Sequence, residues 1–189
     1  MEQTVKKMNK LHSIHALPEG RTFTGEIEAG NAKYQFSFSP KSATIVDRKL
    51  VLAGSVTVKS ARGVKRAIDK VKATLLATQG NPNQAPRASG SLAKFRPAIN
   101  LTPPYTEATG VLSSVGVIYF KLSGLNAKAT GLPLDLSETQ LNARLYATSE
   151  VERDLQWLYS ALVGATLGEN PDEKQASVYL AEINRILAA

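Results

Sequence analysis

The chain lacks several residue types on which whole classes of chemistry depend. It has no cysteine, which excludes disulfides, thiolate zinc sites, iron–sulfur clusters and cysteine nucleophiles. It has only two histidines, His12 and His15, so most histidine-dependent chemistry is excluded as well. We expect neither a metal nor a cofactor, and no catalytic residue is assigned.

Long apolar runs are missing too. No run approaches the ~18 residues that a membrane-spanning helix needs, so no transmembrane segment is expected. Residues 1–18 contain neither a continuous apolar stretch nor a small-residue cleavage site, so they do not form a signal peptide. We expect a cytoplasmic protein if Met1 is the native start, and a secreted or periplasmic one if a signal peptide preceded it.

What is present fits one globular domain of 189 residues, 43% hydrophobic and 21% charged. Residues 1–20 are polar and basic and predict a flexible N-terminal arm. Residues 21–148 predict a β domain. A proline- and glycine-rich loop interrupts this domain at 80–104. Residues 149–189 predict two helices packed on the same domain.

The two-residue period of β-strands begins at Thr22, where apolar and polar side chains start to alternate. Gly30-Asn31 is a two-residue turn signal and predicts a hairpin. Pro40 is expected to end the second strand of that hairpin, because proline cannot donate to a ladder. Two further strands are predicted over 43–46 and 49–60.

The segment Val64 to Gln79 fits both a helix and a strand. Its apolar residues follow helical spacing, yet Val71, Ala73 and Leu75 also alternate with polar residues. Both alternatives stay open, and the strands around the segment favour a strand. Later strands are predicted over 111–122, 132–136 and 141–147, the second of them at a sheet edge because it contains Pro133.

The C-terminal segment carries helix signals. Ser149 and Glu152 form a capping box, and Asn170-Pro171 with Glu173 predicts the start of a second helix. Trp157 lies roughly 120° from the apolar stripe of the first helix, at about 100° per residue. It therefore needs another neighbour, either the terminal helix or a second subunit, and is a candidate interface residue for a homo-oligomer.

These elements predict an α+β fold. We expect a mainly antiparallel β-sandwich or a partly closed barrel of about seven or eight strands, followed by a C-terminal helical hairpin.

Positive charge is concentrated in the first half of the chain. Residues 1–100 carry a balance of +11 and residues 101–189 one of −4, within a total of +7. The stretch Arg48 to Lys72 holds eight basic residues and one acid, which favours an anionic partner such as nucleic acid, an acidic protein or a lipid surface. The candidate anion-binding residues are Arg62, Lys65, Arg66, Lys70 and Lys72.

The arrangement of this charge depends on the segment 64–79. A helix would place it in one compact patch. A strand would divide it between two faces, with Arg66, Lys70 and Lys72 on one and Lys65 on the other. In the second case the stretch is mainly a solvated face that keeps the protein soluble.

Other motifs favour structural roles. Glu26 and Glu28 lie on one side of a strand, like a glycosidase pair, but beside a turn they predict a solvent face. His12-x-x-His15 lacks a third metal ligand. The aromatic residues 34, 36 and 38 predict a core more strongly than a base-stacking surface. Ser91-x-x-Lys94 lacks the companion motifs of penicillin-recognising enzymes.

The leading functional prediction is therefore a non-catalytic binding or interaction module with a basic surface. The alternative is a carrier of an apolar small molecule, held in a cavity of the sandwich or barrel. The third choice is a hydrolase that uses Glu26, Glu28 or Asp135, with the 80–104 loop as its lid.

Overall fold

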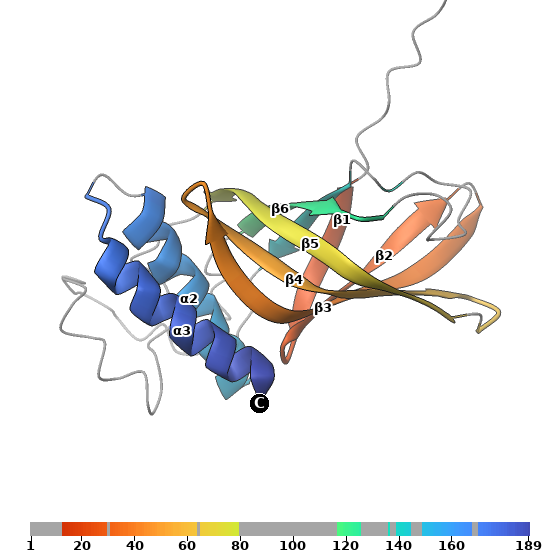
Figure 1. Ribbon diagram of the computed structural model, residues 1–189. Helices are drawn as coiled ribbons and strands as arrows, with labels where there is room; N and C mark the ends of the chain where they lie inside the picture. The colour runs from red at the N-terminus through yellow and green to blue at the C-terminus, as the bar shows by residue number, and fades with distance from the viewer. Residues whose placement is uncertain are drawn as a thin grey trace, which may run out of the picture.

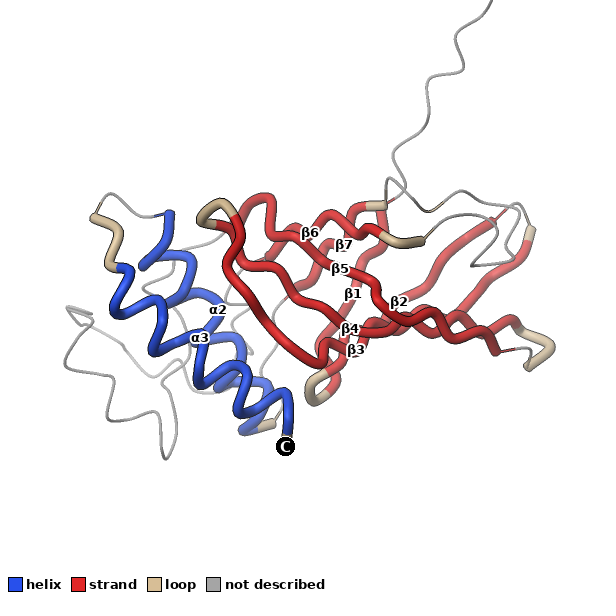
Figure 2. Tube along the Cα trace, viewed as in Figure 1, coloured by secondary structure: helices blue, strands red, loops and turns tan. Residues whose placement is uncertain are grey.

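The computed structural model shows a closed barrel of seven strands with a pair of C-terminal helices, as the sequence predicts (Figures 1 and 2). It describes residues 13–29, 31–63, 65–79, 117–125, 136, 139–144, 149–167 and 170–189. The loop predicted at 80–104 and the strand predicted at 132–136 lie outside these residues, apart from the buried Leu136. In the described part, neither helix is long and apolar enough to cross a membrane.

The barrel follows the chain in order. Its strands are β1 (Ser13–Glu19), β2 (Thr22–Ala29), β3 (Ala32–Val46), β4 (Lys49–Ser60), β5 (Lys65–Gln79), β6 (Val117–Ser123) and β7 (Gln140–Arg144). Each consecutive pair is antiparallel, so odd-numbered strands run in the same direction. With seven strands, β1 and β7 must therefore close the barrel as a parallel pair, in which Ile14 lies opposite Leu141.

The expectation that residues 1–20 form a flexible arm is wrong for residues 13–19. Ser13–Glu19 is strand β1, paired on both sides, while residues 1–12 lie outside the described part. Ile14 and Ala16 are buried and alternate with exposed His15 and Leu17. The residues before this strand are polar and basic, and this makes its two-residue period difficult to recognise in the sequence.

Pro40 does not end β3, which continues through it to Val46. The register between β3 and β4 shifts between Pro40 and Ser42, and Pro40 lies opposite Gly54. A bulge is one of the few places inside a sheet where a residue without an N–H is accommodated. The predicted second and third strands are therefore one bent strand.

The ambiguous segment is strand β5, in agreement with the preference for a strand. Val71, Ala73 and Leu75 point into the barrel, and none is more than 1% exposed. The three-residue spacing from Ile68 to Val71, which resembles that of a helix, arises because a bulge at Asp69 and Lys70 interrupts the alternation.

The two helices are α2 (Glu150–Leu167) and α3 (Glu173–Ala188). The predicted capping box is confirmed: Glu152 N donates to Ser149 Oγ at 3.2 Å, and Ser149 N donates to Glu152 Oε2 at 3.1 Å. The cap of α3 is Asp172, not Asn170. Its Oδ1 accepts a bond from Gln175 N at 3.0 Å, so the helix begins two residues later than the Asn-Pro signal suggested.

The helices cover one end of the barrel, here called the helical end (Figures 1 and 2). The β1–β2 and β3–β4 turns lie there because the strands alternate in direction. Glu152 Oε1 accepts a bond from Gly20 N at 2.8 Å, which joins α2 to the first turn. Arg48 donates from Nε and Nη2 to Thr166 O at 3.0 and 2.7 Å, which joins the second turn to the end of α2. A single hydrophobic core runs through barrel and helices.

Candidate anion-binding site

Four of the basic residues at the end of the barrel away from the helices belong to one hairpin. β4 ends with Lys59, the turn contains Arg62, and β5 begins with Lys65 and Arg66. Gly63 closes the turn: its N–H donates to Ser60 O at 2.9 Å, and its φ of +83° is one that glycine adopts without strain. We call Lys59, Arg62, Lys65 and Arg66 the basic hairpin.

All four side chains of the basic hairpin are exposed. Lys59 lies directly opposite Lys65 across the ladder. Like charges in that position repel each other, because opposed side chains in a sheet are only about 5 Å apart at Cβ. Among the described residues, no carboxylate pairs with any of the four. The described part of the fold therefore contains no ion pair that offsets their repulsion.

Lys70 and Lys72 do not extend this cluster in the predicted way. Val56 pairs with Ile68 and Gly54 with Val71, so Asp69 and Lys70 together oppose a single residue of β4. Lys70 has a φ of +61°, as an inserted residue in a bulge can have.

The bulge shifts the alternation of β5 by one residue. The prediction that Arg66, Lys70 and Lys72 share one face is therefore wrong. Lys72 points outward like Lys65, whereas Arg66 lies on the inward side, opposite Val58, and stays exposed because the strand extends past the barrel wall there.

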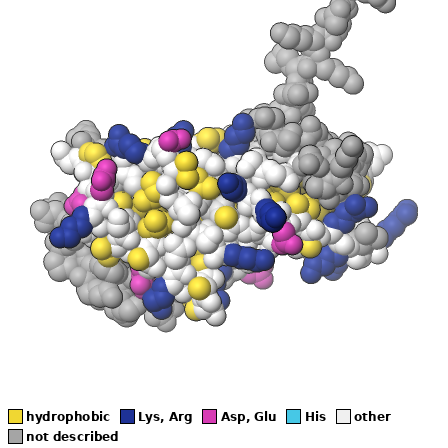
Figure 3. Space-filling view, viewed as in Figure 1, with side chains coloured by type: hydrophobic (Ala, Val, Ile, Leu, Met, Phe, Trp, Pro, Cys, Tyr) yellow, Lys and Arg dark blue, Asp and Glu magenta, His cyan; other side chains and the backbone are white. Residues whose placement is uncertain are grey.

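The long basic stretch of the sequence is thus divided in space. Arg48 is bonded to α2 at the helical end, Lys70 and Lys72 lie along β5, and the basic hairpin lies at the far end. Figure 3 shows Lys and Arg side chains gathered at that far end. Lys59 was not among the candidates predicted from the sequence. In the sequence, Lys59 and Lys65 lie on either side of the Ser60–Gly63 turn, and this position identifies Lys59 as a member of the cluster.

Glu26 and Glu28 lie near the tip of the neighbouring β2–β3 hairpin, on its solvent-exposed face. Lys33 Nζ lies 3.4 Å from Glu28 Oε1 and 4.0 Å from Glu26 Oε2, and all three side chains are at least 64% exposed. Asp135 and His12 lie outside the described residues, and His15 is exposed on β1. Within the described part of the chain, no three histidine or carboxylate side chains gather into a metal-binding group.

The barrel interior is filled at the helical end. The ring centroid of Phe23 lies 6.4 Å from that of Phe38, 6.0 Å from that of Phe120 and 6.5 Å from that of Tyr159. Tyr159 belongs to α2. Aromatic rings at these separations are in contact. Residues 34, 36 and 38 point inward, as a core requires, with Phe36 and Phe38 fully buried and Tyr34 partly so.

Trp157 is buried inside the chain, in agreement with the first of its two predicted neighbours, the terminal helix. It is 3% exposed, and its ring meets Tyr179 of α3 edge-on at a centroid distance of 5.5 Å. The neighbour that covers Trp157 outside the apolar stripe of α2 is therefore the terminal helix of the same chain. Helix α2 packs against both the barrel and α3, and the five consecutive residues from Leu155 to Tyr159 are all buried.

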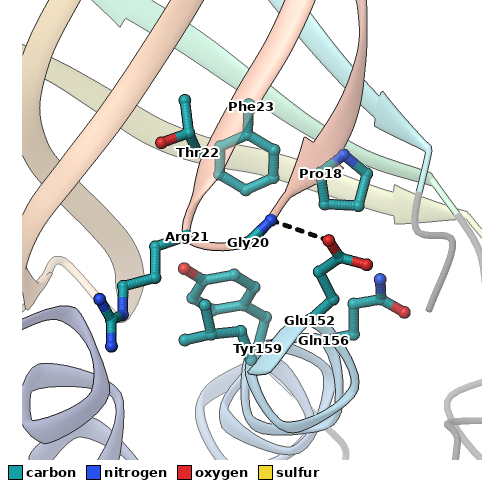
Figure 4. A pocket seen from close by; sticks show the side chains of 9 residues that line it. Pro18, Gly20, Arg21, Thr22, Phe23, Glu152, Gln156 and Tyr159 are labelled. Carbon is teal, nitrogen blue, oxygen red and sulfur yellow. Dashed lines mark hydrogen bonds between the residues drawn. The ribbon is translucent and has the colours of Figure 1, made fainter. Parts of the chain in front are cut away.

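A small pocket lies where α2 meets the β1–β2 turn (Figure 4). Glu152 and Tyr159 rise from the helix toward Gly20 and Phe23. The space open to the centre of a water molecule is about 10 Å³, enough for about one water. Burial raises the pKa of Tyr159 above its ordinary value, because a phenolate would be desolvated there. The pocket is too small for an organic ligand.

Comparison with protein-family models, with curated proteins and with solved structures finds no match to this chain.

Proposed function

We propose that this chain is a non-catalytic binding module that docks on a polyanionic partner through the basic hairpin. The observation that supports this proposal is the opposition of Lys59 and Lys65 across the β4–β5 ladder, with Arg62 and Arg66 beside them. Two lysines in that position repel each other when the partner is absent. An anion that contacts both relieves the repulsion, so binding and fold stability are coupled.

The position of the hairpin also supports docking. It lies at the barrel end away from the helices, so a large partner reaches it without meeting α2 or α3 (Figure 1). Exposed ammonium and guanidinium groups with no carboxylate among their described neighbours attract phosphate, sulfate or carboxylate arrays. The chemistry required of the partner is therefore a dense row of negative charge. In the described part of the chain, no observation favours the carrier or the hydrolase hypothesis, and both stay predictions.

The test is retention on heparin and binding to a short DNA duplex, between about 50 and 200 mM salt. The double substitution Lys59→Gln/Lys65→Gln removes the opposed pair. The matched control Lys49→Gln/Lys174→Gln removes the same charge from two exposed lysines at the helical end. For DNA, we expect the slope of log affinity against log salt to fall by roughly 2 in the hairpin variant and to change little in the control.

Three results would contradict the proposal. They are binding that does not depend on salt, no binding to either polyanion at low salt, and an equal loss in both variants. The last would mean that net charge, not the basic hairpin, controls binding. Thermal unfolding of the hairpin variant supplies a second measurement, because removal of the like-charge pair should leave stability unchanged or higher.

A further inference from the structure

Four strands extend past the point where the barrel closes. β2 is paired with β1 only as far as Gly25, and β5 is paired with β6 only from Lys72 onward. Among the described residues, no strand covers the outer side of 26–29 or of 65–71. We call 26–29 the acidic edge and 65–68 the basic edge; the bulge at Asp69 and Lys70 ends the regular part of the latter.

The two edges carry opposite charges. One row of paired residues crosses the extension from Glu26 to Gln35, Lys59 and Lys65. A carboxylate therefore begins this row at one free edge, and an ammonium group ends it at the other. Glu28 adds a second carboxylate to the acidic edge, and Arg66 adds a second cation to the basic edge.

The number of strands makes the edges compatible. β2 to β5 are four consecutive antiparallel strands, so β5 runs opposite to β2. When a second copy lies beside the first in the same orientation, its β2 is antiparallel to the first copy's β5. The sheet then continues from one copy to the next with the same alternation.

We propose that the basic edge of one copy pairs with the acidic edge of another, so that the chain self-associates head to tail. Side chains must keep their faces, and β1 occupies the position beside Gly25. The register that satisfies both conditions places Lys65 opposite Glu28 of the second copy and Ala67 opposite Glu26. Such a heterologous contact leaves a free edge at each end, so it builds rings or open chains and not only dimers.

The existing pairs of the acidic edge do not oppose this contact. Among the described residues, the ion-pair partner of both Glu26 and Glu28 is the exposed Lys33, and exposed pairs contribute little to stability. The ladder itself is only about three residues long. Association is therefore weak, concentration-dependent and favoured by low salt, since exposed charges are screened within about 10 Å at 0.1 M.

Sedimentation velocity over a range of protein concentrations at low salt tests this proposal. We expect the wild-type chain to form oligomers that salt dissociates. Lys65→Glu places two carboxylates opposite each other at positions 65 and 28, and Glu28→Lys places two ammonium groups there, so each variant alone should be monomeric. An equimolar mixture should associate again, because positions 65 and 28 then carry complementary charges. The control Glu173→Lys/Lys174→Glu changes exposed residues of α3 and should behave as wild type.

A wild-type chain that is monomeric at every concentration, or a mixture that stays monomeric, overturns the proposal. The charges would then serve only to keep free edges from aggregating. Heparin retention separates this result from a failure of the proposed function. Glu28→Lys removes self-association but leaves the basic hairpin intact, so its retention should not fall.

Discussion

Asn184 of α3 replaces a missing strand beside Ala43. Its side-chain Oδ1 accepts a bond from Ala43 N at 2.7 Å, and its Nδ2 donates to Ala43 O at 2.9 Å. β2 pairs with β3 only from Phe38 to Ala32, so the buried Ala43 lies beyond the end of its neighbouring strand. One amide side chain thus satisfies both backbone groups of an uncovered β3 residue and fixes α3 against the barrel.

Asn184→Ala should lower the free energy of unfolding by about 1–3 kcal/mol, because it leaves a buried donor and acceptor of Ala43 without partners. Asn184→Asp keeps the acceptor but places a carboxylate against Ala43 O, so it should be at least as destabilising. Chemical denaturation measures both. The exposed Lys174→Ala is the control and should stay within about 0.5 kcal/mol of wild type. An unchanged midpoint for Asn184→Ala would show that the pairing adds nothing.

Two glycines should respond to alanine in opposite directions. A Cβ at Gly54 would overlap the carbonyl oxygen of Ser39 and the Cα of Pro40, where the bulged strand crosses close by. Gly54→Ala should therefore destabilise the fold by about 1–3 kcal/mol or more. Gly164 lies exposed in α2 with nothing within 4 Å of a new Cβ, so Gly164→Ala should stabilise by up to about 1 kcal/mol. Shifts of the same sign in thermal unfolding would contradict this pair.

Tyr159→Phe should leave stability at pH 7 unchanged or raise it by about 1 kcal/mol. The buried hydroxyl of Tyr159 has no hydrogen-bond partner among the described residues, so its removal leaves no group unsatisfied. The same substitution at Tyr179 should be less well tolerated, because the Tyr179 side chain is hydrogen-bonded to Gln175. Tyr179→Phe is therefore the matched comparison and should be destabilising by about 1 kcal/mol.

The same tyrosine predicts a change of stability with pH. Burial raises the pKa of Tyr159 in the folded state, so the unfolded chain loses this proton first, at its ordinary pKa of about 10. The stabilisation is fully present below pH 10 and is lost as pH rises from 10 toward the folded-state pKa, by up to about 1.4 kcal/mol per pH unit. Tyr159→Phe should make the alkaline decline shallower, and Tyr179, whose pKa is also raised by burial, accounts for part of the rest. Equal alkaline slopes for both proteins would refute this assignment.

Much of the fold could be predicted from the sequence where one local pattern decided it. The Gly30-Asn31 signal marks the hairpin that joins β2 and β3, and Ser149 with Glu152 marks the start of α2. These features depend on residues within a few positions of one another. The wrong prediction for Pro40 and the alternatives left open for Trp157 concern residues whose role is set from far away: Pro40 is accommodated by Gly54 of the next strand, and Trp157 is covered by Tyr179 of the next helix.

The candidate site shows the same division. The sequence by itself determined that eight basic residues lie between Arg48 and Lys72 and that strands flank them. Only the tertiary structure decided that Arg48 bonds to a helix, that a bulge moves Lys72 to the outer face, and that Lys59 opposes Lys65. The physical reason is that side-chain alternation is a local property of a strand. Register, bulges and the point where a barrel closes depend on partners that pairing brings together across the sheet.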